Sequence, residues 1–154
     1  MSEAILGLMI NPLPADLILP ATLERGALYL GSVNALTPRF LKKHNIHVII
    51  SMKRVPKMNG GLYHYQFPLP DHRSANPQMQ QILPSIISLI DTHRKTGHNV
   101  LVHCHAGIHR APTVVSHYIQ KYEGHTVNSS IKLIRSVRPI AFYDGNTFDL
   151  RVKK

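Results

Sequence analysis

The only cysteine of this 154-residue chain lies in a short segment whose residue types suit phosphate chemistry. Residues 103–110 have the sequence HCHAGIHR, so Cys104 is followed at fixed spacing by Gly107 and Arg110. A thiolate is a strong nucleophile, and an arginine guanidinium binds phosphate oxygens through two parallel hydrogen bonds. The spacing therefore predicts a nucleophile and a phosphate-binding cation within one loop.

The segments on either side of this loop have the patterns of a strand and a helix. Residues 99–103 form a short apolar run rich in β-branched side chains, which is typical of a buried strand. Residues 111–119 carry apolar side chains at helical spacing, and Pro112 suits a first helical turn. A loop of this kind collects backbone N–H groups in one concavity, and the helix N-terminus adds partial positive charge. We expect this concavity to bind a dianion.

The loop resembles that of a known enzyme family. Its His103, Cys104, Gly107 and Arg110 match the HCxxGxxR pattern of the cysteine-dependent protein phosphatases, and HCHAGIHRAPTVV is similar to the small dual-specificity members. The similarity covers roughly residues 27 to 148. It implies a dual-specificity protein phosphatase of the small, catalytic-domain-only type, which hydrolyses phosphotyrosine and phosphoserine or phosphothreonine through a phosphocysteine intermediate. The alternative, an inert core cysteine, leaves the glycine and arginine at this spacing unexplained.

The resemblance implies a role for each residue of the loop. It makes Cys104 the nucleophile, and it makes Arg110 a catalytic residue that holds the phosphate together with the backbone amides of residues 105–110. His103 would support the loop and the thiolate by hydrogen bonding. The substrate-binding residues predicted in this way are His103, His105, Ala106, Gly107, Ile108, His109 and Arg110.

The departing oxygen needs a proton from a carboxylic acid on a nearby loop. Most of the eight acidic residues fall near a terminus or within a predicted helix. Asp71 alone lies in a proline-stiffened loop after a strand, 33 residues before Cys104, where the resembling family has its general-acid loop. We predict Asp71 as the general acid; the alternative is a surface turn in which this aspartate caps the next segment.

The chain departs from the family pattern in two places. Ala111 stands where the family has a serine or threonine whose hydroxyl donates to the sulfur, so we expect a less stabilised thiolate. Thr113 compensates only if the backbone brings its hydroxyl back to the sulfur. Near the C-terminus, the segment 142–148 is one residue longer than the family pattern, so either Asp144 or Asn146 takes the place of the family's asparagine.

The order of the predicted elements indicates an α/β fold. Apolar and β-branched runs predict strands at residues 27–32, 47–51, 63–67 and 99–103. Helical spacing predicts helices at residues 37–43, 74–95, 111–119 and 126–137, with a restart or a kink at Pro84 in the second. We therefore predict a central mixed, mostly parallel sheet flanked by helices, with the phosphate-binding loop between a central strand and a helix.

We expect two parts along the chain, an N-terminal arm (residues 1–24) and a catalytic domain (residues 25–154). Prolines at positions 12, 14 and 20 make the arm a short helix or an extended segment. Residues 4–10 are apolar but too few to span a membrane, and we expect no membrane span. Exchange of such an arm between two copies is an inexpensive route to a homodimer.

A net charge of +10 attracts anionic partners of several kinds. The basic residues are spread along the chain without an arginine-rich tract, so we expect phosphoprotein substrates and no stable nucleic acid complex. Two other functions remain open. One is a phosphatase acting on phosphoinositides or on the 5′-triphosphate end of RNA, and the other is a weakly active phosphate-binding module.

Eleven histidines raise the question of a metal-dependent hydrolase. His103, His105 and His109 have spacings found in some metal sites, but no carboxylate joins them nearby and the cation of Arg110 opposes a divalent ion. We predict no metal and no cofactor. The single cysteine excludes an intramolecular disulfide and fits a reducing compartment, so we expect a cytoplasmic or nuclear protein.

Overall fold

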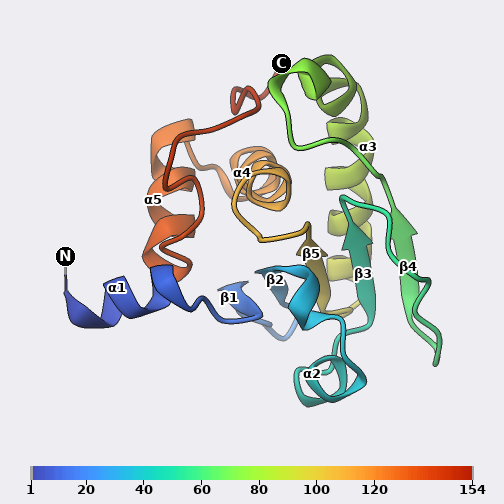
Figure 1. Ribbon diagram of the computed structural model, residues 1–154. Coiled ribbons are helices and arrows are strands. Elements are labelled where there is room, and N and C mark those ends of the chain that lie inside the picture. The colour runs from blue at the N-terminus through green and yellow to red at the C-terminus, as the bar shows by residue number, and fades with distance from the viewer. Residues whose placement is uncertain (1, 154) are drawn as a thin grey trace.

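Five strands form one mixed sheet in the computed structural model, which describes residues 2–153 (Figure 1). In their order across the sheet, the strands are β1 (Ala15–Leu19), β2 (Leu28–Gly31), β5 (Val100–His103), β3 (Val48–Ser51) and β4 (Tyr63–Gln66). The first pair, β1 and β2, is antiparallel, and every other pair of neighbours is parallel. This confirms the predicted α/β class, a mixed and mostly parallel sheet with the strand before Cys104 at its centre.

Helices cover both faces of the sheet. The helices of the protein are α1 (Glu3–Ile10), which does not lie on the sheet, α2 (Pro38–Lys43), α3 (Asn76–Lys95), α4 (Arg110–Glu123) and α5 (Val127–Val137), with short 3₁₀ turns at Val33–Ala35 and Arg73–Ala75. α3, α4 and α5 lie on one face, and α2 lies on the other (Figure 1). Val100 and Val102 of the central strand belong to the core on the first face, whereas Leu101 belongs to the core on the second. The alternation of side chains along a strand produces this division.

Local sequence signals set the helix ends. The Thr37 hydroxyl accepts a hydrogen bond from the Phe40 amide at 3.1 Å and caps α2, and Gly124 ends α4 in a left-handed conformation with φ of 73°. Of the two outcomes predicted at Pro84, a restart is wrong, because α3 runs unbroken from Asn76 to Lys95. The apolar side of α3 is buried in the core, and this burial offsets the backbone hydrogen bond that a proline cannot make.

The sequence pattern does not predict β1, which lies within the segment expected to be an arm. Prolines flank this strand, and Asp16 stands inside it. Burial raises the pKa of the Asp16 carboxyl, and the Arg138 guanidinium, 2.9 Å away, limits that rise. The strand therefore depends on a partner 122 residues away, which a local pattern does not reveal. The division of the chain at residue 24 stays a prediction.

None of the side chains of α1 is fully buried, and the helix extends away from the sheet (Figure 1). Ile5, Leu6 and Ile10 of this helix are 43%, 48% and 75% exposed. Within residues 2–153, the structure contains no helix with the length and apolar character needed to cross a membrane.

Candidate active site

The loop between β5 and α4 turns its carbonyl groups toward the protein. Each carbonyl of residues 104–109 accepts a hydrogen bond. The donors, given in the order of the carbonyls along the chain, are His103 Nδ1, Val33 N, Arg138 Nη2, Arg138 Nε, Phe142 N and Thr113. The C=O and N–H of a trans peptide point in opposite directions, so the amides of residues 105–110 point away from these partners. The amides of residues 105–109 donate to no other group in the described part of the chain. The loop thus presents an array of free N–H donors, which is the arrangement that binds an anion.

Arg138 fixes the outer side of this loop. Its side chain is 1% exposed, and it donates from Nη2 to the Ala106 carbonyl at 2.9 Å and from Nε to the Gly107 carbonyl at 3.1 Å. Gly107 has a φ of 71°, and a Cβ atom there would lie 2.7 Å from Arg138 Nη2 and 2.8 Å from the Gly31 carbonyl oxygen. The loop therefore requires glycine at position 107 for its conformation and for its close packing.

Arg110 is the first residue of α4, and it joins the loop to the segment that carries Asp71. Its Nη1 donates to the Leu69 carbonyl at 2.9 Å. Its Nε is buried and has no hydrogen-bond partner within residues 2–153. A buried donor without a partner costs about 1–3 kcal/mol, and a phosphate oxygen bound in the loop would satisfy it.

A pocket of about 380 Å³ gathers most of the predicted site residues. Cys104 is 2% exposed and lies in its wall. His103 and Gly107 are both buried and do not line this pocket. The residues that line it are Lys53, Asp71, Cys104, His105, Ala106, Ile108, His109, Arg110, Tyr143 and Asp144.

His109 links two carboxylates at the rim of this pocket. Its Nδ1 lies 3.0 Å from Asp71 Oδ2, and its Nε2 lies 2.7 Å from Asp144 Oδ1. Burial lowers the pKa of His109, but the two carboxylates outweigh burial and raise the pKa above its ordinary value. The hydrogen bond from His109 in turn lowers the pKa of Asp144. The His109 imidazole therefore contacts the predicted general acid, Asp71, beside the loop.

His103 lies behind the loop at the end of β5. Its Nδ1 donates to the Cys104 carbonyl at 2.9 Å, and its Nε2 lies 2.5 Å from Ser51 Oγ. Burial lowers the pKa of His103 to about 4, although the hydrogen bond to the Cys104 carbonyl opposes that change. His103 is therefore a neutral imidazole at physiological pH.

We expect the folded protein to lose stability as the pH falls from 7 to about 4. An unfolded histidine has a pKa of about 6.5, whereas that of His103 is about 4. Between these values the unfolded chain binds more protons, so acid favours unfolding. His103 alone accounts for roughly 3 kcal/mol of this loss. Burial lowers the pKa in the same direction for His47, His64, His93 and His117.

Urea unfolding at pH 7.5 and at pH 4.5 measures this effect. The raised pKa of His109 acts oppositely, because its stabilisation is complete below pH 6.5 and is lost as the pH rises above the folded value. Among the histidines with shifted pKa values, five lose stability in acid and one gains it, so we expect a net loss in acid. A free energy of unfolding that stays constant or increases at pH 4.5 would contradict the burial of neutral histidines.

The three histidines considered as metal ligands face different partners. His103 contacts Ser51, His105 accepts a hydrogen bond from Lys53, and His109 bridges its two carboxylates. No group of three or more potential ligand side chains within residues 2–153 is arranged to hold a metal ion.

The structure locates the residues at both departures from the family pattern. Ala111 is fully buried in α4, and the Thr113 hydroxyl donates to the His109 carbonyl at 2.7 Å. The Thr113 hydroxyl is thus engaged within its own helix rather than with the sulfur. In the C-terminal segment, Asp144 faces His109, whereas the Asn146 amide donates to the Phe148 carbonyl at 3.0 Å.

Sequence reasoning does not identify Lys53, Tyr143 and Arg138 as residues of the site. Lys53 Nζ donates to His105 Nδ1 at 3.2 Å and brings a cation to the pocket. A signal for Lys53 exists, because it follows the carboxyl end of β3, and ligands gather at the carboxyl ends of parallel strands. Tyr143 and Arg138 reach the loop only through tertiary contacts of the C-terminal third of the chain.

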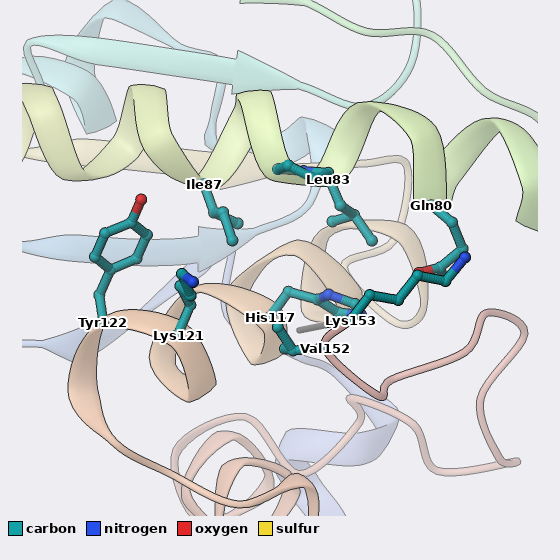
Figure 2. A pocket seen from close by; sticks show the side chains of 9 residues that line it. Gln80, Leu83, Ile87, His117, Lys121, Tyr122, Val152 and Lys153 are labelled. Carbon is teal, nitrogen blue, oxygen red and sulfur yellow. The ribbon is translucent and has the colours of Figure 1, made fainter.

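A second hollow, of about 140 Å³, lies between α3 and α4 (Figure 2). Leu83 and Ile87 form its apolar floor, and Lys121 and Lys153 stand beside it. It contains neither the cysteine nor a carboxylate. Cys104 and Asp71 instead lie together in the 380 Å³ pocket beside the loop.

Comparison with known proteins relates the chain to phosphatases. Residues 28–151 match the family model described as dual specificity phosphatase, catalytic domain. The chain is 30% identical over 125 residues to dual specificity protein phosphatase 1 of Arabidopsis thaliana and 30% identical over 125 residues to dual specificity protein phosphatase Mpk3 of Drosophila melanogaster. These matches cover 79% and 78% of this chain but only 62% and 30% of the two relatives. The chain therefore spans less than two thirds of the length of each.

Solved structures have the same fold. The structure of human DUSP28 superposes with a TM-score of 0.73 at 20% identity, over 84% of each chain. That of DUSP15 superposes with a TM-score of 0.67 at 28% identity, over 81% of this chain and 78% of the other.

Proposed function

We propose that this chain, which belongs to the dual specificity phosphatase family, hydrolyses phosphate monoesters of tyrosine and of serine or threonine in proteins. The observation that carries the proposal is the array of unpaired donors beside the one cysteine. The amides of residues 105–109 and the buried Nε of Arg110 have no partner in the described chain, and together they match the oxygens of a phosphate dianion.

In the first half-reaction, the Cys104 thiolate attacks phosphorus and the bond from phosphorus to the ester oxygen breaks. Asp71 gives its proton to the departing oxygen, while the loop amides and Arg110 hold the other phosphate oxygens. In the second half-reaction, water attacks the phosphocysteine and the phosphorus–sulfur bond breaks. Asp71, now a carboxylate, takes the proton of that water, and inorganic phosphate leaves.

The family match supports protein substrates ahead of polyanions. The pocket carries charges of both signs, because Asp71 and Asp144 line it together with Lys53 and Arg110. A phosphorylated side chain brings a single dianion to the loop. We therefore rank phosphoproteins first, in a cytoplasmic or nuclear compartment that keeps the single cysteine reduced.

A substrate panel tests this proposal. We expect phosphotyrosine and phosphothreonine peptides to be hydrolysed with kcat/KM values roughly tenfold or more above those for phosphoinositides and triphosphate RNA. Turnover confined to lipid or RNA would replace the proposed substrate class. Stoichiometric phosphopeptide binding without turnover would leave a phosphate-binding module.

Ala111 is expected to make phosphocysteine hydrolysis the slow step. No side-chain hydroxyl at position 111 stabilises the departing sulfur, and Thr113 is engaged with His109. Rapid mixing with an aryl phosphate should give a burst of phenol that approaches one equivalent of enzyme. Ala111→Ser should raise the steady-state rate about threefold to tenfold and shrink the burst. Absence of a burst in the parent, with both phases unchanged in the serine variant, would contradict this expectation.

We also propose a homodimer that forms through the N-terminal arm. α1 is apolar and none of its side chains is fully buried, so pairing with a second copy would remove its exposed leucine and isoleucines from water. Light scattering should give twice the 17.3 kDa mass, and Leu6→Asp should reduce it to one chain. Leu23→Asp is the matched control, because Leu23 is exposed but lies outside α1. A monomeric parent protein would exclude the dimer.

A further inference from the structure

Behind the catalytic loop, four hydrogen bonds join five groups in an unbranched chain. The Met58 amide donates to His64 Nδ1 at 2.9 Å, and His64 Nε2 lies 2.8 Å from Ser51 Oγ. Ser51 Oγ lies 2.5 Å from His103 Nε2, and His103 Nδ1 contacts the Cys104 carbonyl at 2.9 Å. The chain connects the surface segment around Met58 to the peptide group of the proposed nucleophile.

The direction of every bond follows from its first member. A backbone amide only donates, so His64 Nδ1 must accept and neutral His64 carries its proton on Nε2. That proton points to Ser51 Oγ, which leaves the hydroxyl proton of Ser51 for His103 Nε2. His103 then carries its own proton on Nδ1 and donates it to the Cys104 carbonyl. Burial and the nearby Lys57 lower the pKa of His64, in agreement with the neutral form.

Burial makes this direction important. Ser51 and His103 have no exposed surface, so water does not replace a missing member of the chain. If His103 carried its proton on Nε2, the lone pair of Nδ1 would face the lone pairs of the Cys104 carbonyl oxygen. That repulsion would rotate the Cys104 peptide and move the sulfur and the first loop amide.

We propose that Ser51 and His64 are positioning residues that hold His103 in the Nδ1–H tautomer and thereby fix the Cys104 peptide in its anion-binding orientation. The kinetic part of this inference rests on the proposed phosphatase activity, whereas the tautomer does not. Gln66 holds the segment that precedes Met58, because its side-chain amide exchanges two hydrogen bonds with the Val55 backbone, at 3.0 Å and 2.9 Å. Neither Ser51 nor His64 touches the substrate pocket.

Ser51→Ala removes the central hydroxyl and tests the inference. We expect kcat on an aryl phosphate to fall about tenfold with KM nearly unchanged, and we expect alkylation of Cys104 by iodoacetate to require a higher pH. Nitrogen NMR of the imidazoles should show that His103 loses its uniform Nδ1–H tautomer. Ser116→Ala is the matched control, because Ser116 is equally buried and its hydroxyl lies 2.7 Å from that of Ser130, away from the loop. It should change none of these three readouts.

A pair of substitutions at His64 separates hydrogen bonding from packing. The glutamine amide of His64→Gln can donate to Ser51 from about the position of Nε2, whereas His64→Leu cannot donate at all. We expect His64→Leu to reproduce the three effects of Ser51→Ala and His64→Gln to retain most of the parent kcat. His64 is only half-buried, so the His64 variants still test the inference if Ser51→Ala does not fold.

Two results overturn the inference. One is a folded Ser51→Ala or His64→Leu variant with kcat within twofold of the parent, an unchanged alkylation profile and His103 still in the Nδ1–H form. The other is a parent protein in which His103 carries its proton on Nε2. A parent without Cys104-dependent turnover refutes the proposed function instead, and the NMR measurement still decides the tautomer.

Discussion

Cys104→Ser is expected to abolish turnover of an aryl phosphate and to leave the fold intact. A serine hydroxyl keeps its proton under conditions in which a thiol in an anion-binding loop loses it, so the variant lacks the nucleophile. We expect a loss of roughly a thousandfold or more in kcat. Serine differs from cysteine by one atom, so the buried side chain of residue 104 still fits among its neighbours.

Circular dichroism and thermal melting of Cys104→Ser check that its fold survives. In the parent, iodoacetate should inactivate the enzyme by modifying one residue, and inorganic phosphate should protect against it, because both compete for the same pocket. A serine variant that retains turnover within tenfold of the parent would remove Cys104 from the mechanism.

Asp71→Asn should produce a loss that depends on the leaving group. A phosphoserine peptide has a poor leaving group that needs a proton, so its hydrolysis should slow by roughly 10²–10⁴-fold. A highly acidic phenol departs without a proton, so its hydrolysis should slow by less than about tenfold. Asparagine keeps the shape of the side chain and an oxygen that can accept from His109.

Asp144→Asn is the matched control for Asp71→Asn. Asp144 contacts the other nitrogen of the same imidazole and lines the same pocket, so its removal disturbs His109 in a similar way. It should lower both rates by similar, small factors. Equal losses on the two substrates in Asp71→Asn, with selective loss in Asp144→Asn, would transfer the general-acid role to Asp144.

The loop and its flanking elements could be predicted because their signals are local. An apolar β-branched run, a cysteine–glycine–arginine spacing and a proline in the first helical turn lie within residues 99–112, and the structure places β5, the loop and the start of α4 there. The same holds for α2, whose Thr37 cap and Pro38 are adjacent in sequence. The central position of β5 followed from the preference of ligands for the carboxyl ends of strands.

Other features depend on partners distant in sequence. A local pattern does not predict β1, because Arg138 stabilises the charged Asp16 within this strand. α3 continues past Pro84 because its buried face compensates for the lost hydrogen bond. The contact of Asp144 with His109 depends on how the C-terminal segment returns to the loop, where the Phe142 amide donates to the Ile108 carbonyl at 2.9 Å. The spacing of residues along the sequence does not reveal these contacts.

Identification of the phosphorylated residue tests the central claim most directly. The enzyme is mixed with a radiolabelled aryl phosphate, quenched within the burst and digested, and the labelled peptide is located by mass spectrometry. We predict close to one equivalent of label on the peptide that contains Cys104, with the phosphate on sulfur. Turnover without a labelled intermediate, or label on His105 or His109, would contradict phosphoryl transfer to Cys104.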